Sequence, residues 1–333
     1  MNKIKVAFYA SDFIFLHPII DILSRDAQFE CRSFTGGDLN EALTLESWSD
    51  VSWIDWCDVN AVGLTQQPKL CKKIVIRLHS YEAFNEWPSK IEWKNVDRLI
   101  IVSEGTDRVL TSIHQNLLDW MRPENTKIIH NGLDFDKFQI PENKEFNKKI
   151  AYVGSINYKK GPAVLINLFE VIHSYDREFT LHIAGEFQDP RYEVYIRDFL
   201  LETKLPVFFN GHVEDIPNWL KDKTFVINTS LFESFCYGIA EAIACGLLPV
   251  CYRWHGFTDL YPSNWSFRTF DDAIKLLIYY ENTMGGAVHA EINKPLIFPE
   301  VENLRRNNRL YLQKRYDIKD KVEEIKKLLL ELV

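Results

Sequence analysis

The sequence lacks the features that would place it in a membrane or among disulfide-rich secreted proteins. No apolar run in its 333 residues approaches the ~20 residues that a membrane-spanning helix needs. The six cysteines form no C-x-x-C pair and most lie in apolar segments, so we expect buried free thiols in a reducing compartment. No signal-peptide core follows the N-terminus, which leads directly into a predicted strand. We therefore expect a cytoplasmic protein.

Positive charge is also in short supply. The formal net charge is −8, which argues against binding to nucleic acid. No polybasic stretch is present to attract anionic lipid, although peripheral contact with a membrane through aromatic residues of the N-terminal half stays an open alternative. There is no low-complexity segment and no short-period repeat. The length and the 46% hydrophobic content suit two globular domains with substantial cores.

Short apolar segments alternate with helical segments along the chain. Several predicted strands are apolar throughout, which is typical of a parallel sheet in an α/β protein. Ligands bind such sheets beyond the carboxyl ends of the strands. The predicted strands cover residues 3–10, 29–34, a part of 51–62, 73–78, 98–103, 126–130, 149–153, 179–184, 207–210, 224–228 and 250–252. The predicted helices cover residues 17–25, 106–120, 162–174, 189–201, 238–245, 270–280, 301–316 and 317–332.

The stretch between the strands at 224–228 and 250–252 points to an anionic ligand. Its loop leads backbone N–H groups into the N-terminus of the helix at 238–245, where the helix dipole favours a phosphate. Glu233 lies in this loop and Glu241 lies on the first turn of the helix. Two carboxylates can accept hydrogen bonds from a ribose on one side of a diphosphate and from a hexose on the other. The alternative is that both are ordinary glutamates, although Glu241 lies among apolar residues, where a carboxylate needs a partner.

A second loop carries cations at the end of the strand at 149–153. It reads Gly-Ser-Ile-Asn-Tyr-Lys-Lys-Gly over residues 154–161 and leads into a helix that starts near Pro162. Two glycines around a lysine pair can present N–H groups and a cation to a phosphate. The order differs from that of a P-loop, because G-x-x-x-x-G-K-[ST] is absent. The alternative for Lys160 is an exposed loop cation.

His79 follows the strand at 73–78 directly. A lone histidine is more often structural, but a position at the carboxyl end of a parallel strand favours contact with a ligand. The aromatic residues that follow, beginning with Tyr81, either stack on an acceptor or cap the domain.

Glu233 and Glu241, followed by Ala-x-x-x-Gly and then Pro249-Val250, resemble the signature of family 4 retaining glycosyltransferases. The loop at 154–161 resembles the lysine-containing diphosphate loop of that family. The segment at 253–262, with Gly256 and Asp259, resembles a bacterial surface-polysaccharide subgroup. The resemblance implies the GT-B fold, an α/β architecture of two Rossmann-like domains that face each other across a cleft. The implied domains are an acceptor-binding domain at 1–138, a donor domain at 149–300, and helices at 301–333 that cross back to the first domain.

The resemblance also implies site residues. Ser155 stands where the family has an arginine, so either Lys159 or Arg253 substitutes for it or phosphate binding is weaker. The loop after the first strand contains no glycine, which counts against a phosphate contact there. The implied roles are catalysis for Glu233 and His79; diphosphate binding for Lys160, Ser155, Phe235, Cys236, Tyr237 and Gly238; ribose binding for Glu241; a place near the base for Gly185, His212 and Val213; and a place on the acceptor side for Asp12, Tyr81 and Glu82.

The implied function is transfer of a hexose-type sugar, with retention, from a nucleotide diphosphate sugar to a saccharide or lipid-linked glycan. We expect no metal ion, because no D-x-D-like motif lies beside the diphosphate loop, and no cofactor besides the nucleotide-sugar co-substrate. Two alternatives stay open. One is a sugar-nucleotide epimerase on the same fold, and the other is a non-catalytic protein that binds a nucleotide sugar. Ser155 and the glycine-free first loop support the second.

Overall fold

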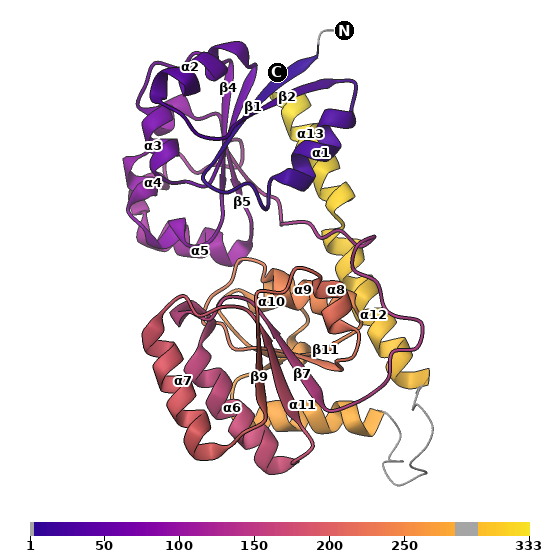
Figure 1. The fold of residues 1–333 in the computed structure, drawn as a ribbon. Coiled ribbons are helices and arrows are strands. Elements are labelled where there is room, and N and C mark those ends of the chain that lie inside the picture. Colours follow the sequence, from indigo (N-terminus) through magenta and orange to yellow (C-terminus); the bar gives the residue numbers. More distant parts are fainter. Residues whose placement is uncertain (1–2, 284–298) are drawn as a thin grey trace. The chain divides into compact units, whose positions relative to one another are not determined.

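The computed structural model describes residues 3–283 and 299–333. The chain forms two compact units, each with a six-stranded parallel sheet between helices (Figure 1). Unit 1 comprises Met1–Gly132 and Tyr316–Val333, and unit 2 comprises Leu133–Arg315. The sequence predicted that the first domain ends at residue 138, that the donor domain starts at 149 and that helices from 301 onward cross back to the first domain. In the structure, unit 1 ends at Gly132 and resumes at Tyr316. The two sheets and their flanking helices are those of the GT-B fold.

Unit 1 has strand order β2-β1-β3-β4-β5-β6. Its strands are β1 (Ile4–Ala10), β2 (Phe29–Phe34), β3 (Val51–Asp55), β4 (Lys73–Leu78), β5 (Arg98–Ile101) and β6 (Thr126–Ile128). Its helices are α1 (His17–Arg25), α2 (Leu39–Trp48), α3 (Val59–Thr65), α4 (Trp87–Lys90), α5 (Glu104–Ile113) and α13 (Ile318–Leu332), with 3₁₀ turns η1 (Glu82–Phe84), η2 (Trp93–Asn95) and η3 (Gln115–Leu117).

Both faces of the unit 1 sheet are covered, which explains why its central strands are almost continuously apolar. Every residue of β3 is buried. Helices α1 and α13 pack on one face, where Leu23, Val322 and Leu329 share a core with Val6 and Phe8. Helices α2 to α5 lie on the other face (Figure 1).

Unit 2 has strand order β12-β11-β10-β7-β8-β9. Its strands are β7 (Lys149–Val153), β8 (Thr180–Ala184), β9 (Val207–Gly211), β10 (Phe225–Asn228), β11 (Leu248–Tyr252) and β12 (Ser266–Phe267). Its helices are α6 (Pro162–Tyr175), α7 (Pro190–Thr203), α8 (Ile216–Leu220), α9 (Tyr237–Ala244), α10 (Phe257–Leu260), α11 (Phe270–Thr283) and α12 (Pro299–Tyr316, which runs on into unit 1), with 3₁₀ turns η4 (Tyr158–Lys160) and η5 (Ser263–Trp265).

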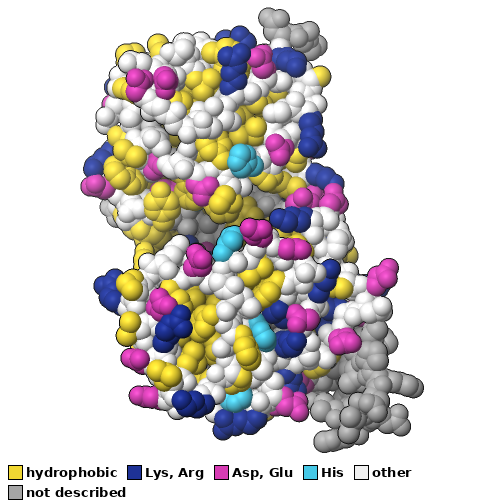
Figure 2. All heavy atoms as spheres, in the orientation of Figure 1, with side chains coloured by type: hydrophobic (Ala, Val, Ile, Leu, Met, Phe, Trp, Pro, Cys, Tyr) yellow, Lys and Arg dark blue, Asp and Glu magenta, His cyan; other side chains and the backbone are white. Residues whose placement is uncertain are grey.

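The core of unit 2 lies under α6, α7 and α11, which contribute residues such as Phe169, Ile196 and Leu277 against the sheet. Helices α8 and α9 lie on the other face (Figure 1). On the molecular face in Figure 2, side chains of both charges are interspersed, and hydrophobic side chains form separate groups between them.

The structure departs from the sequence prediction at several elements, among them a shortened helix and helices that were not predicted. The helix expected at 106–120 ends at Ile113, because the next side chain, His114, turns inward and bonds Ser89 Oγ (2.9 Å) and the Ala83 carbonyl (3.2 Å). Helices α2 and α3 were not predicted. The signal for α2 was present in the sequence, since Asp38 and Glu41 form a capping box at its N-terminus.

Candidate functional site

The loop of unit 2 that carries Lys159 and Lys160, here called the cationic loop (residues 154–161), is hydrogen-bonded to the loop after β10. The Thr229 hydroxyl donates to the carbonyls of Lys160 (2.9 Å) and Gly161 (3.1 Å), and the Leu231 N–H donates to the Lys159 carbonyl (2.8 Å). Gly161 has φ +62°, and a Cβ there would lie 2.3 Å from the Thr229 carbonyl oxygen. Only glycine fits this close approach. These hydrogen bonds place both lysines beside the loop that carries Glu233.

Glu233 forms ion pairs with both lysines. Its Oε1 lies 2.5 Å from Lys160 Nζ, its Oε2 lies 3.3 Å from Lys159 Nζ, and the Ser230 hydroxyl donates to Oε1 at 2.9 Å. Burial alone would raise the pKa of Glu233, but the two lysines hold it below its usual range. Burial would lower the pKa of Lys160, and the Glu233 carboxylate instead raises it. Glu233 and Lys160 are therefore both charged at neutral pH.

The predicted amide positions 235–238 lie at the N-terminus of α9, next to the end of β7. Gly238 makes this contact possible, because a Cβ there would lie 2.3 Å from the Val153 carbonyl oxygen. Cys236 adopts a left-handed conformation (φ +66°), and its sulfur accepts a hydrogen bond from Asn228 Nδ2 (3.4 Å). Phe235 is fixed by its carbonyl, which accepts from the Tyr261 hydroxyl. The N-terminus of α9 therefore lies close to the loop at 154–161, whose first residue follows β7.

Glu241 is the fifth residue of α9, because the helix begins at Tyr237 rather than at 238, and so it lies beyond the first turn. Within residues 3–283 and 299–333, no group hydrogen-bonds its carboxylate. Burial raises the pKa of Glu241 to about 7, and Lys137 counteracts this in part. The partner that a carboxylate in this setting needs is therefore not supplied by the described part of the chain.

A cavity of about 320 Å³ gathers other predicted residues of unit 2. Ser155, Gly185, His212 and Val213 all line it. Gly185 allows β7 and β8 to converge there, because a Cβ on it would lie 1.9 Å from the Gly154 carbonyl oxygen. The residues predicted to lie near the base therefore line the same pocket as Ser155, which stands where the family has an arginine.

Of the two expected substitutes for that arginine, Lys159 reaches Glu233 and Arg253 does not. The Arg253 guanidinium donates to Ser266 Oγ (2.9 Å) and to the Ser263 carbonyl (3.5 Å).

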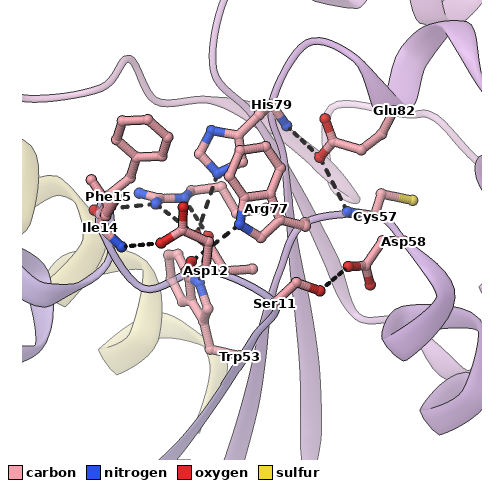
Figure 3. Close-up of polar contacts among 12 residues, drawn as sticks. Ser11, Asp12, Ile14, Phe15, Trp53, Cys57, Asp58, Arg77, His79 and Glu82 are labelled. Carbon is pink, nitrogen blue, oxygen red and sulfur yellow. Dashed lines mark hydrogen bonds and ion pairs between the residues drawn. The ribbon is translucent and has the colours of Figure 1, made fainter. Parts of the chain in front are cut away.

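Unit 1 contains a second buried ionic cluster, centred on Asp55. Its members Arg77 and His79 are labelled in Figure 3. Arg77 on the neighbouring strand donates to both oxygens of Asp55 (2.6 and 3.0 Å), and His79 Nε2 lies 3.3 Å from Oδ2. Strand register creates the pair, because Asp55 and Arg77 are direct partners in β3 and β4. Burial would raise the pKa of Asp55, but Arg77 and then His79 bring it down to about 2. An ionised carboxylate only accepts, so His79 Nε2 is the donor.

Two aromatic side chains, which also contact each other, pack against the His79 ring. Trp56 stacks on it at 4.0 Å between ring centroids, and Phe15 packs at 5.6 Å. Trp56 has φ +77°, which is an outlier for a bulky residue, and its indole N–H donates to the Asp12 carbonyl (3.2 Å). Nδ1 of His79 makes no hydrogen bond to any residue in the described ranges. With Nε2 as donor, Nδ1 is the atom that can accept a hydrogen bond from a ligand.

The three predicted acceptor-side residues differ in position. Tyr81 is 44% exposed and its ring packs on Trp56. Asp12 is exposed, and its carboxylate accepts from the Ile14 N–H (2.8 Å). Glu82 is fully buried, and its Oε1 accepts from the backbone N–H groups of His79 (3.0 Å) and Cys57 (3.2 Å). Glu82 therefore joins the loops after β3 and β4 (Figure 3).

Sequence reasoning missed Arg77 as a site residue. The signal was a single arginine inside the apolar run Ile74–Leu78, since a buried charge requires a partner. No group of three His, Cys, Asp or Glu side chains in residues 3–283 and 299–333 is placed to hold a metal ion. No helix in the same part of the chain is both long and apolar enough to cross a lipid bilayer.

Residues 134–264 match the sequence model of the family Glycosyl transferases group 1. One component of the human phosphatidylinositol N-acetylglucosaminyltransferase is 27% identical over 146 residues, which cover 43% of this chain and 30% of that protein. The chain thus spans less than a third of this curated relative.

Solved structures show the same fold at low identity. HepE from Anabaena, in complex with UDP-glucose, superposes with a TM-score of 0.74 at 16% identity over 98% of this chain and 99% of its own. TarM superposes with a TM-score of 0.66 at 16% identity, over 84% of this chain and 54% of its own.

Proposed function

We propose, from the match of residues 134–264 to the family Glycosyl transferases group 1, that the chain transfers a hexose-type sugar from a nucleotide diphosphate sugar. The proposed acceptor is a saccharide or a lipid-linked glycan, and the proposed transfer retains the anomeric configuration and uses no metal ion. The observation that carries the proposal is the cluster of Lys159, Lys160 and Glu233 beside the N-terminus of α9.

The cluster supports the proposal because its cations can change partners. A diphosphate at the α9 N-terminus would draw the ammonium groups of Lys160 and Lys159 away from Glu233. Glu233 would then need new donors, which the hydroxyl groups of a hexose supply. The lysines would neutralise the negative charge that develops on the leaving diphosphate, in place of a metal ion. In the same proposal Glu241 accepts from the ribose hydroxyls, which gives its unpartnered carboxylate donors.

We propose attack on the same face of the sugar as the leaving group. The acceptor oxygen bonds to C1, the bond from C1 to the phosphate oxygen breaks, and the acceptor proton passes to that phosphate oxygen. This assignment is supported by the engaged carboxylate of Glu233. Its oxygens bind two lysines in the structure and, in the proposal, hexose hydroxyl groups once the lysines turn to the diphosphate, so neither oxygen is left to attack C1. His79 is proposed to accept a hydrogen bond from a sugar hydroxyl through Nδ1.

The first test is thermal unfolding with UDP, GDP, ADP, dTDP and CMP in the presence of EDTA. HepE is named in complex with UDP-glucose, so UDP is the first candidate. A ligand at 100 times its Kd stabilises by about 2.7 kcal/mol. We expect one nucleotide to stabilise the wild type and Glu202→Ala, which changes an exposed glutamate at the end of α7, and to stabilise Glu241→Ala less. The donor-site assignment fails if no nucleotide stabilises the wild type.

The second test follows the corresponding sugar nucleotide by NMR. Transfer to an added glycan with the same anomeric configuration supports the proposal. Conversion to an isomeric sugar nucleotide without acceptor would indicate an epimerase. Binding without turnover across glycan acceptors would indicate a non-catalytic protein.

A further inference from the structure

A second hollow lies in unit 1, outside the residues discussed so far. Its volume is about 390 Å³, within the range of small-molecule sites of roughly 300–1,000 Å³. It lies beyond the carboxyl ends of β1 and β2, where the loop Phe34–Asp38 meets the first turns of α2 and α3. The strand order 2-1-3 places the topological switch point of the sheet between β1 and β3, where α/β proteins bind ligands. The hollow borders this point through Ala10 of β1 and Asn60 of α3, the helix that follows β3.

The hollow is kept open by small residues. A Cβ added to Gly36 or to Gly63 would meet no atom within 4 Å. Gly63 lies inside helix α3, where glycine costs about 1 kcal/mol relative to alanine. Its backbone does not need glycine, because it is not among the residues with positive φ. Neither backbone geometry nor close packing accounts for Gly63, whereas an open pocket does.

The walls of the hollow are apolar on one side and polar on the other. The rings of Tyr9 and Phe34 pack together at 5.8 Å, and the Tyr9 hydroxyl is held by the Ala42 carbonyl (3.1 Å). The polar side carries the neutral groups of Asn60 and Ser11, with Asn60 Nδ2 donating to Ser11 Oγ at 2.9 Å, and one carboxylate, that of Asp38. Such a surface suits a ligand with both hydroxyl groups and C–H faces.

The electrostatics of the hollow disfavour an anion. None of its lining residues is Lys, Arg or His. The N-termini of α2 and α3 are already capped by carboxylates, since Asp38 accepts from the Glu41 N–H (3.0 Å) and Asp58 from the Asn60 N–H (2.8 Å). These carboxylates occupy the positions that a phosphate would otherwise take.

We propose that this hollow, which we name the β1–β2 pocket, binds a neutral sugar unit of the acceptor. The proposal rests on the proposed glycosyl transfer. The loop after β1 links the pocket to the His79 site, because Ser11 lines the pocket and Phe15 packs on the His79 ring. An acceptor with one sugar in the pocket would therefore lie along this loop towards His79.

The test fills the pocket without disturbing the backbone. Gly63→Ala and Gly63→Leu place side-chain atoms in the hollow, and Asn60→Ala removes a polar group from it. Ser112→Leu is the matched control, because it adds leucine to an exposed helix position of the same unit. Saturation-transfer NMR on the full chain measures binding of methyl glucoside, methyl N-acetylglucosaminide, lactose and cellobiose, with glucose 6-phosphate and cyclohexanol as contrasting probes.

We expect at least one neutral glycoside to bind the wild type and Ser112→Leu, and to bind Gly63→Leu about tenfold more weakly, a loss of about 1.4 kcal/mol. Asn60→Ala should weaken the same glycoside. The proposal is overturned if no glycoside signal depends on position 63, or if glucose 6-phosphate or cyclohexanol binds the pocket in preference. Stabilisation of Gly63→Leu by the nucleotide against thermal unfolding measures donor binding in unit 2, which the substitution in unit 1 does not touch. A failure of the donor site can therefore be told apart from a failure of the pocket.

Discussion

The two units each bury a carboxylate that binds two nitrogen-bearing side chains near the carboxyl ends of parallel strands, but the partners differ in kind. In unit 1, Asp55 is held by Arg77 and His79. In unit 2, Glu233 is held by Lys159 and Lys160. The two clusters share a buried carboxylate but differ in how firmly their cations are held.

Arg77 is fixed in place, because its side chain is 5% exposed, lies within a strand, binds Asp55 with two nitrogens and also reaches the Phe15 carbonyl. The lysines lie on one loop with side chains 17% and 30% exposed, and an ammonium group can rotate to a new acceptor. The arginine cluster therefore orients a neighbour, His79, whereas the lysine cluster can exchange partners with a ligand.

The largest expected effect comes from breaking the exchangeable cluster. Lys160→Ala leaves Glu233 buried with only the more distant Lys159, which we expect to destabilise unit 2 by about 3 kcal/mol. It should also abolish the stabilisation that a bound nucleotide diphosphate gives, because the closest cation is lost. Chemical unfolding with and without UDP measures both effects.

Lys159→Ala is the internal control for this experiment, with a smaller loss in both measurements because its nitrogen lies farther from Glu233. Full stabilisation of Lys160→Ala by the nucleotide would contradict the assignment of Lys160 to the diphosphate.

The Asp55 cluster of unit 1 should instead make the free energy of unfolding depend on pH. The folded pKa of Asp55 is about 2, below the usual 3.8. Its contribution to stability is therefore present above pH 4 and is lost as the pH falls towards 2, and amounts to about 2 kcal/mol. Asp55→Asn should be less stable than the wild type at pH 7, and the difference should shrink by that amount at pH 2. The free energy of unfolding at both pH values measures this.

Asp119→Asn, at an exposed position of unit 1, should leave the profile unchanged. A pH-independent difference between Asp55→Asn and the wild type would show that Asp55 is not held ionised by Arg77.

Glu241 should make stability depend on pH in the opposite direction. Its folded pKa of about 7 lies above the usual 4.5, so stability is lost as the pH rises from 4.5 through 7. Glu241→Gln should match the wild type near pH 4 and exceed it at pH 8 by about 1.5 kcal/mol, less than the full shift implies because the side chain is partly exposed. The same variant should bind the nucleotide more weakly. Glu202→Gln serves as control, and a wild type more stable than Glu241→Gln at pH 8 would refute the assignment.

How much of each site could be predicted differs for a physical reason. In unit 2 the strand, loop and helix that carry Gly154 to Lys160 are contiguous, as are those that carry Glu233 and Glu241. Local sequence therefore encodes their geometry. In unit 1 the Asp55–Arg77 pair depends on the register of β3 against β4, which a single sequence does not specify. The sequence marked His79 by its position after a strand, but not the groups that hold its ring.

The β1–β2 pocket is harder still to predict, because it is defined by the absence of side chains at Gly36 and Gly63 on elements brought together by the fold. A glycine in sequence does not distinguish an open space from a turn. Gly37, next in the chain, has φ +148° and a Cβ on it would meet the Glu41 carboxylate at 1.9 Å.

The smallest expected effect tests how rigidly each cluster is held. Trp56 and Cys236 both have positive φ, at +77° and +66°, which costs a non-glycine residue about 1–2 kcal/mol. Because glycine tolerates this conformation, Trp56→Gly should be more stable than Trp56→Ala by about 1 kcal/mol, although both lose the stack on His79. Cys236→Gly and Cys236→Ala form the matched pair in unit 2. Equal stability of the glycine and alanine variants at position 56, by urea unfolding, would mean that the backbone relaxes there and that unit 1 is not the more rigidly held of the two sites.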